Sequence, residues 1–248
     1  MEHSTISIDM DYKEDEELIV KPIQVEKFEM ENVNENFPQH PTLLYTCSPT
    51  GSGKSTLVQY LLASPYNQYF NKIFYFCPTM HQASWKKFKI DYDRVYPHYS
   101  DADFEKVLEE IKQDEDEKCL IVIDDCTATN LFRRENAISR FVFNHRHFPS
   151  SKTGTSIWII SHQYKAIPKN VRSVIKDLLI FQIHSGEEIK EIAEDVRGLM
   201  SMKDFLKLYH LCTDEKYNFM YVKKEVKDQS ERIRRNFNTI FKITYNKD

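Results

Sequence analysis

The sequence predicts an α/β fold in which a mainly parallel sheet is sandwiched by helices. Three observations support this prediction. Short apolar runs alternate with helical patterns, the runs are rich in β-branched and aromatic residues, and they show little alternation with polar residues. Such strands are typically buried on both faces, as in a parallel sheet covered by helices. With 248 residues, the chain has room for one large domain of this kind and too few residues for two.

The elements follow one another in the order expected of a doubly wound domain. Five strands and one late strand or hairpin are expected at 42–47, 72–78, 119–124, 155–161, 177–183 and 217–225. Helices are expected at 55–64, 101–113, 129–145, 188–198 and 201–212. The helix at 101–113, for example, has Phe104, Val107 and Ile111 on one face and acids on the other.

The N-terminal segment differs in composition from the rest of the chain. Its first eighteen residues hold seven acids and one lysine. We therefore expect an acidic flexible arm over residues 1–26, followed by one domain over residues 27–248 with a basic extension from about residue 223. The arm lacks the apolar core of a secretory signal, and no run of eighteen apolar residues follows. Neither secretion nor a membrane-spanning helix is expected, and a cytosolic or nuclear location is the default.

The loop after the first strand carries the strongest motif. "SPTGSGKST" (48–56) contains two of the five glycines of the chain, and a helix is expected to begin near Lys54. Glycines let backbone N–H groups close on phosphate oxygens, and the helix start adds its positive end. This context predicts a P-loop, or Walker A motif, although Ser48 stands where the pattern has glycine. The expected ATP-binding residues are Thr50, Gly51, Ser52, Gly53, Lys54, Ser55 and Thr56, with Lys54 on the β- and γ-phosphates and Ser55 on Mg²⁺.

Two acids end the strand at 119–124, in "LIVIDD". Asp124, at the strand tip, is the expected second Mg²⁺ ligand, as in a Walker B motif. Asp125 is expected to orient or deprotonate the attacking water. Many hydrolytic P-loop enzymes have glutamate at this second position, so Asp125 is a departure from the pattern.

The strand at 155–161 ends in a third polar group, Ser161-His162-Gln163. In P-loop proteins with a catalytic acid after the second motif, this strand lies between the first and third strands, which is the RecA/ASCE order. Gln163 is then expected to contact the attacking water and a phosphoryl oxygen as a sensor, with His162 as the alternative.

Charge is distributed unevenly around these motifs. The net charge is −4, yet nine Lys or Arg and one acid lie between Arg133 and Lys176. A basic stripe of this kind is suited to DNA phosphates. Within it, Arg146 is a candidate for an arginine finger that reaches a neighbour's nucleotide, or for DNA contact, and Arg172 is a second candidate for either role.

The five cysteines have no paired spacing, which predicts reduced core residues and no zinc site or disulfide framework.

Taken together, these residues resemble the genome-packaging ATPases of large DNA viruses and virophages, the poxvirus-like branch of the FtsK–HerA superfamily. The resemblance spans roughly residues 38–225 and is carried by "SPTGSGKST", "LIVIDD", "RHFPSS" and "ISHQYKAIPKNVRSVIKDLLIF". It implies a ring-shaped homo-oligomer that hydrolyses ATP with Mg²⁺ and pumps double-stranded DNA into a capsid. It also implies Gln163 as the sensor and Arg146 as the finger acting in trans. A capsid or portal-vertex partner, and a place in the host cytoplasm, in a virus factory or on the virion, follow from the same resemblance.

Other functions share parts of this pattern. A small-molecule kinase, such as one acting on nucleosides or nucleotides, would also have the P-loop, although two acids followed by a strand ending in glutamine suit water activation better. A non-catalytic assembly factor would bind ATP only as a structural ligand, yet Lys54, Asp124 and Asp125 are all present. A GTPase is disfavoured because the chain has no Asn-Lys-x-Asp motif with the required spacing.

Overall fold

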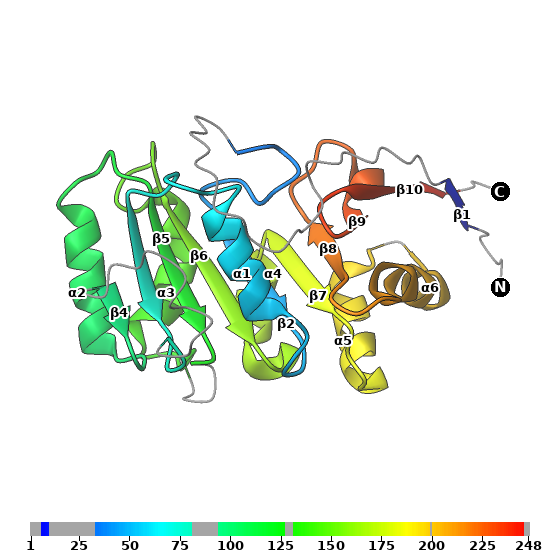
Figure 1. The fold of residues 1–248 in the computed structure, drawn as a ribbon, viewed down its shortest axis with the longest axis horizontal. Helices are drawn as coiled ribbons and strands as arrows, with labels where there is room; N and C mark the ends of the chain where they lie inside the picture. Colours follow the sequence, from blue (N-terminus) through cyan, green and yellow to red (C-terminus); the bar gives the residue numbers. More distant parts are fainter. Residues whose placement is uncertain (1–5, 10–32, 81–93, 127–130, 199, 246–248) are drawn as a thin grey trace.

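A single large sheet organises the part of the chain that the structure, a computed structural model, describes: residues 6–9, 33–80, 94–126, 131–198 and 200–245. Its strand order is β1-β10-β9-β8-β7-β2-β6-β5-β3-β4 (Figure 1). The strands are β1 (Ile6–Asp9), β2 (Leu43–Cys47), β3 (Lys72–Phe76), β4 (Val95–Tyr96), β5 (Cys119–Asp124), β6 (Thr155–Ser161), β7 (Asp177–Phe181), β8 (Phe219–Lys223), β9 (Ile233–Arg235) and β10 (Thr239–Tyr245).

The sheet has a parallel half and an antiparallel half. Strands β4, β3, β5, β6, β2 and β7 run parallel to one another. From β7 onward, β8, β9, β10 and β1 pair antiparallel. Strand β6 lies between β2 and β5, so the expected RecA/ASCE order of the core is confirmed. The late element expected at 217–225 is the single strand β8, and a further antiparallel pair that was not expected, β9 with β10, follows it in the C-terminal extension.

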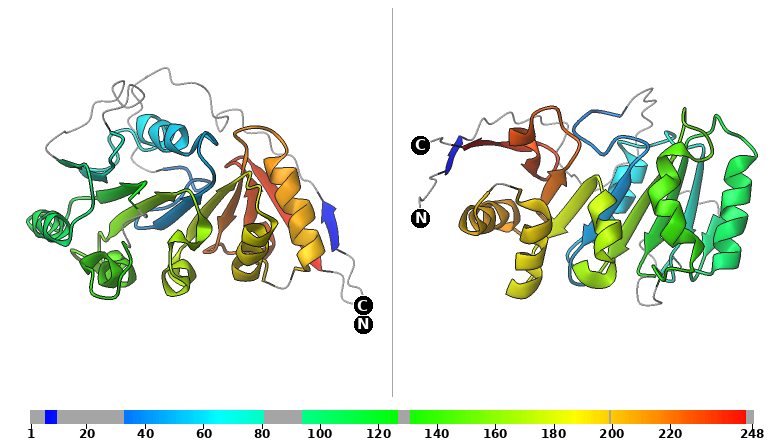
Figure 2. Two further views of the ribbon diagram at one scale, coloured as in Figure 1. Left: turned by 90° about the horizontal axis from the view of Figure 1, so that it is seen from below. Right: turned by 180° about the vertical axis from the view of Figure 1, so that it is seen from behind.

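Helices cover both faces of the sheet, and the two faces differ (Figure 2, left). Helix α1 (Lys54–Ala63) packs on one face, in a core that includes Leu57, Leu61 and Trp158. The other face carries the remaining α-helices, in a core that includes Phe104 and Phe205. These helices are α2 (Asp101–Lys112), α3 (Ala137–Asn144), α4 (Lys169–Val174), α5 (Gly186–Val196) and α6 (Met202–Thr213).

Burial and capping explain why these segments adopt these structures. Every residue of β2, β5, β6 and β7 is buried, which accounts for their continuous apolar sequences. Helices α2, α5 and α6 each begin after a serine whose hydroxyl accepts a hydrogen bond from the backbone N–H three residues on. The serines are Ser100, Ser185 and Ser201.

Most expected elements are present, with shifts at their ends. The strand expected at 177–183 ends at Phe181, and the one expected at 217–225 is β8. The helix expected at 129–145 begins only at Ala137, and residues 127–130 lie outside the described residues. Most of the expected arm lies outside them too, while Ile6–Asp9 pair with β10.

All five cysteines are free and buried, as expected. In the described ranges, no helix has the length and apolar character that a membrane crossing requires.

Candidate active site

The loop between β2 and α1 forms the centre of the site. Gly51 and Gly53 adopt φ of +81° and +100°, a region that L-residues with side chains rarely occupy, so glycine is needed at both turns. Ser48 is buried, and its hydroxyl forms a short hydrogen bond with the Ser52 hydroxyl across the loop. The departure from glycine at position 48 therefore places a side-chain contact inside the loop.

Lys54 opens α1 and folds back over the loop. Its Nζ donates to the carbonyl oxygen of Ser48 at 2.5 Å and to that of Pro49 at 2.9 Å. Burial, with only 6% of the residue exposed, lowers the pKa of Lys54. An ammonium group held by neutral carbonyls in a desolvated position is poised for a stronger, charged acceptor such as a phosphate. Thr50 and Thr56, the first and last of the expected ATP-binding residues, are exposed.

Ser55 and Asp124 meet beneath the loop, and their oxygens suit a magnesium ion. Ser55 Oγ donates to Asp124 Oδ2 at 3.2 Å. Burial raises the pKa of Asp124 to about 6, the charge of Asp125 adds to this, and the Ser55 bond opposes it. A desolvated carboxylate beside a hydroxyl is the oxygen donor set that Mg²⁺ takes, with phosphates and water completing its shell. Within the described residues no group of three or more His, Cys, Asp or Glu side chains is placed to hold a metal ion.

Asp125 follows β5 in an unusual backbone conformation. Its φ is +57°, and its N–H donates to the carbonyl oxygen of Ile160 on β6 at 3.3 Å. The left-handed region is tolerated best by Gly, Asn and Asp, so aspartate suits this position better than glutamate would. This turn directs the carboxylate toward His162, whose Nε2 lies 3.1 Å from Asp125 Oδ1. Both side chains remain about two-fifths exposed, at 41% and 42%.

His162 connects the acid to the phosphate loop. Its Nδ1 lies 3.3 Å from Lys54 Nζ and 3.5 Å from Thr50 Oγ1. Since an ammonium group can only donate, Nδ1 accepts from Lys54, and Nε2 carries the proton that faces Asp125. His162 was expected only as the alternative to Gln163, yet it is His162 that bridges the P-loop and the β5 turn.

Gln163 lies next to this bridge, at the tip of β6. Its carbonyl oxygen accepts hydrogen bonds from Tyr45 Oη at 2.7 Å and Ser161 Oγ at 2.8 Å, which anchor its backbone. In the described part of the chain, no hydrogen bond or ion pair involves its side chain, and the residue is exposed. The sensor role of Gln163 remains a prediction.

The two candidate arginines have very different surroundings. Arg172 is buried, and its guanidinium binds Asp195 at 2.8 Å and Glu191 at 2.9 Å. Arg146, in the short helix His145–His147, is half exposed and has a loose 3.7 Å contact with Glu225. Its helix packs against the start of β6, where His145 Nδ1 binds the carbonyl oxygen of Thr155. Arg146 is therefore the accessible arginine, at the opposite edge of the sheet from the P-loop.

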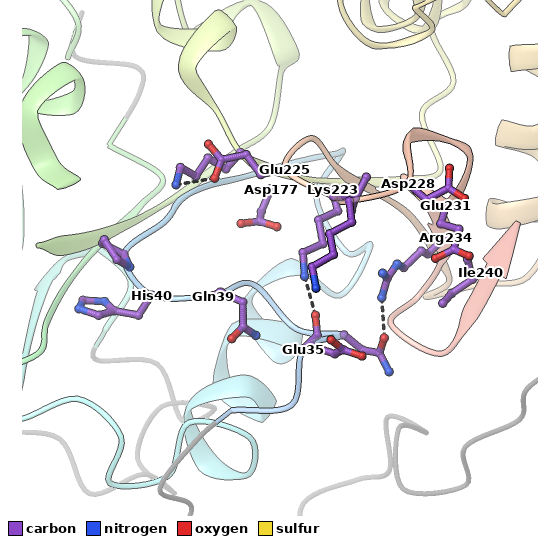
Figure 3. A pocket seen from close by; sticks show the side chains of 15 residues that line it. Glu35, Gln39, His40, Asp177, Lys223, Glu225, Asp228, Glu231, Arg234 and Ile240 are labelled. Carbon is purple, nitrogen blue, oxygen red and sulfur yellow. Dashed lines mark hydrogen bonds and ion pairs between the residues drawn. The ribbon is translucent and has the colours of Figure 1, made fainter. Parts of the chain in front are cut away.

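A cavity of about 560 Å³ lies at that opposite edge (Figure 3). Lys223 Nζ points to the carbonyl oxygen of Glu35 at 2.5 Å, and Arg234 points to the Asn36 side chain at 2.7 Å. None of the predicted ATP-binding residues lines it. The other catalytic candidates, Lys54, Asp125 and Gln163, lie instead where the carboxyl ends of β2, β5 and β6 meet, the usual ligand edge of a parallel sheet.

Solved structures with a similar architecture include proteins of Sulfolobus viruses. The genome-packaging NTPase B204 of Sulfolobus turreted icosahedral virus 2, with sulfate, has a TM-score of 0.59 and 14% identity, covering 79% of this chain and 96% of that one. B204, the DNA-packaging ATPase of Sulfolobus turreted icosahedral virus, has a TM-score of 0.59 and 15% identity, covering 80% and 98%. The virus 2 protein with ATPγS has a TM-score of 0.56 and 14% identity, covering 79% and 96%.

This chain has the fold of a P-loop NTPase. The likeness confirms the predicted fold class and agrees, at the level of the fold, with the resemblance to the packaging ATPases. No protein-family profile matches the sequence. No curated protein gives a significant match either.

Proposed function

We propose that this chain is a Mg²⁺-dependent ATPase that drives double-stranded DNA into a viral capsid. One observation carries the proposal: Lys54 and Ser55 of the P-loop converge with Asp124, Asp125 and His162 at one edge of the sheet. These residues can bind a triphosphate and activate water, and the chain shares its fold with a DNA-packaging ATPase.

In this proposal each residue of the edge has a distinct task. Backbone N–H groups of residues 50–55 and the side chains of Lys54 and Thr56 bind the phosphates of ATP. Ser55 and Asp124 hold Mg²⁺, which supplies charge neutralisation on the phosphate oxygens. Asp125 accepts a proton from the attacking water, and the His162 N–H keeps its carboxylate oriented. Gln163, one residue further, senses the γ-phosphate.

Arg146 completes the site of a neighbouring copy in the proposed ring. Strand β6 has seven residues, and a strand of that length separates its two ends by about 20 Å. This distance is too long for Arg146, packed at the start of β6, to reach the nucleotide of its own subunit. In a head-to-tail ring, by contrast, different edges of successive subunits meet, and an arginine can act in trans.

DNA contact is proposed for the basic residues between 133 and 176. Helices α3 and α4 pack side by side, and the basic residues on and around them are largely exposed. The exposed members are Arg133, Arg134, Arg140, Arg146, Lys152, Lys165 and Lys169. Such residues bind phosphates without reading sequence. A capsid or portal-vertex protein is the partner that this function requires, in a virus factory or on the virion.

The test is phosphate release from ATP and Mg²⁺, with and without duplex DNA of two unrelated sequences, with the oligomer mass measured in the same buffer. We expect both DNAs to stimulate hydrolysis equally at about 50 mM salt and to lose most of the effect near 200 mM. Lys54→Ala is the inactive control. If DNA does not change the rate of hydrolysis at low salt and no DNA binding is measured, the proposed DNA translocation is refuted. Phosphoryl transfer to nucleosides with little hydrolysis would favour the kinase.

A further inference from the structure

The turn between α6 and β8 brings an exposed aromatic ring to the P-loop. Tyr217 is 57% exposed, yet a methyl group added at Gly53 would lie only 3.0 Å from its Cδ1. Gly53 is the last loop residue before Lys54. The ring therefore lies against the loop that is proposed to hold the phosphates, although 164 positions separate the two residues in the chain.

The sheet fixes this placement. Strand β8 pairs antiparallel with β7, with Phe219 opposite Phe181, so β8 begins at the edge where β7 and β2 end (Figure 1). The turn itself is anchored on both sides of the tyrosine. Arg235 on β9 binds Asp214 at 3.0 Å, and Asn236 donates to the Asn218 side chain at 2.9 Å.

Tyr217 has a backbone conformation that is unfavourable for an aromatic residue in a turn with only a structural role. Its φ is +75°, a region that favours glycine and is uncommon for an aromatic residue. The ring gains little burial in return, because more than half of the residue stays exposed. The neighbouring residues, rather than the ring, supply the hydrogen bonds that hold the turn. An unfavourable conformation at the rim of a candidate site is a signal of function.

We propose that Tyr217 is a stacking surface for the base of the bound nucleoside triphosphate. The inference rests on the nucleotide-binding part of the proposed function and is independent of DNA translocation. When the loop holds the phosphates, the rest of the nucleotide extends past the loop rim, where an aromatic face can stack on a purine. Lys216 Nζ lies 4.8 Å from the centroid of the same ring, which adds positive charge beside the nucleotide.

This contact gives affinity with little choice between bases, because every base has a π-face. Hydrogen bonds that read a base edge are the usual source of strong discrimination, and stacking supplies none. Stacking on Tyr217 therefore adds affinity for ATP and GTP alike and does not by itself select between them.

The experiment compares two probes, ATP and inorganic tripolyphosphate, which carry a triphosphate chain with and without the nucleoside. Tyr217→Gly removes the ring and suits the positive φ, so the variant is expected to fold. It should weaken ATP binding about tenfold and leave tripolyphosphate binding within about twofold. Tyr217→Phe should bind both probes as the unaltered protein does. Phe143→Ala, which removes another exposed ring, is the matched control.

Tyr217→Trp provides a direct reporter. Its fluorescence should be quenched by ATP and unaffected by tripolyphosphate if the base stacks on the ring. If Tyr217→Gly lowers the affinity for ATP and for tripolyphosphate equally, the ring only supports the loop, and the inference is overturned. Unchanged ATP binding in that variant would overturn it as well. If the unaltered protein binds tripolyphosphate but not ATP, nucleotide binding itself is refuted. ATP binding without DNA stimulation refutes only the motor.

Discussion

Asp125 is the residue whose replacement separates nucleotide binding from hydrolysis. Asparagine keeps its size and tolerates the φ of +57°, so Asp125→Asn should leave the turn intact. The amide cannot accept a proton from water, and we expect turnover to fall by about 10²–10⁴-fold with ATP affinity nearly unchanged. Steady-state hydrolysis and equilibrium ATP binding measure the two effects. Asp116→Asn, on an exposed loop, is the control. Unchanged turnover would remove Asp125 from the base role.

His145 makes the stability of the fold depend on pH. Only 2% of the residue is exposed, and burial lowers its pKa to about 4. The unfolded chain takes up this proton near pH 6.5 while the folded chain does not. The contribution of neutral His145 to the free energy of unfolding is therefore fully present above about pH 6.5 and is lost as the pH falls toward 4. For one such histidine the loss between pH 7 and pH 5 is about 2 kcal/mol.

His145→Gln tests this assignment, because glutamine keeps an N–H donor for the Thr155 carbonyl and cannot titrate. Urea unfolding at pH 7 and pH 5 should show a smaller loss of stability in the variant, by about 2 kcal/mol. The pKa of His40 is also lowered to about 4, mainly by burial, so part of the dependence should remain. His98→Gln, at an exposed position, controls for the substitution itself. The same pH dependence in His145→Gln and the unaltered protein would contradict the assignment.

At the scale of elements, the buried strands were the most predictable features. The strands expected at 119–124 and 155–161 match β5 and β6 end for end, because full burial on both faces leaves an unbroken apolar run. Helix α4 was not predicted, since its six residues begin at Lys169, directly after Pro168, and are too few for a helical period. Strand β9 was missed because its sequence is Ile-Arg-Arg, and pairing rather than hydrophobicity defines it.

The site was predictable where one loop holds it and obscure where contacts cross the fold. Ser55 and Asp124 were assigned from their motifs, and they hydrogen-bond in the structure. His162 was underrated because sequence does not reveal the backbone turn that points Asp125 at it. Tyr217 could not be found at all, because only the pairing of β8 with β7 brings it to Gly53.

Helix α4 is attached to α5 through the buried guanidinium of Arg172. This group binds Asp195 and Glu191 and lies 4.6 Å from the centroid of the Tyr164 ring. Arg172→Met would leave two partly buried carboxylates without their cation. We expect a loss of about 3 kcal/mol in the free energy of unfolding, measured with urea. Lys169→Met, exposed on the same helix, should change it by less than about 0.5 kcal/mol. Equal stability of the two variants would show that α4 does not depend on this pair.

At the scale of the whole molecule, the candidate catalytic groups lie on two opposite edges of one sheet. The P-loop, Asp124 and Asp125 lie where the parallel strands end, whereas Arg146 and the cavity of Figure 3 lie where they begin. A single copy therefore cannot bring all these groups to one nucleotide. In the proposed ring, successive copies join opposite edges, and Arg146 of one copy would complete the site of the next.

Mixing two inactive variants tests that arrangement. Arg146→Ala keeps a complete P-loop, while Lys54→Ala keeps the arginine that its neighbour needs. Each alone should hydrolyse ATP at background rate. In rings reassembled from equal amounts, about a quarter of interfaces join an intact P-loop to an intact arginine, so part of the activity should return. Lys54→Ala mixed with Asp125→Asn should recover nothing, because both defects lie in the same site. If native mass spectrometry shows mixed rings and the first pair stays inactive, Arg146 does not act in trans.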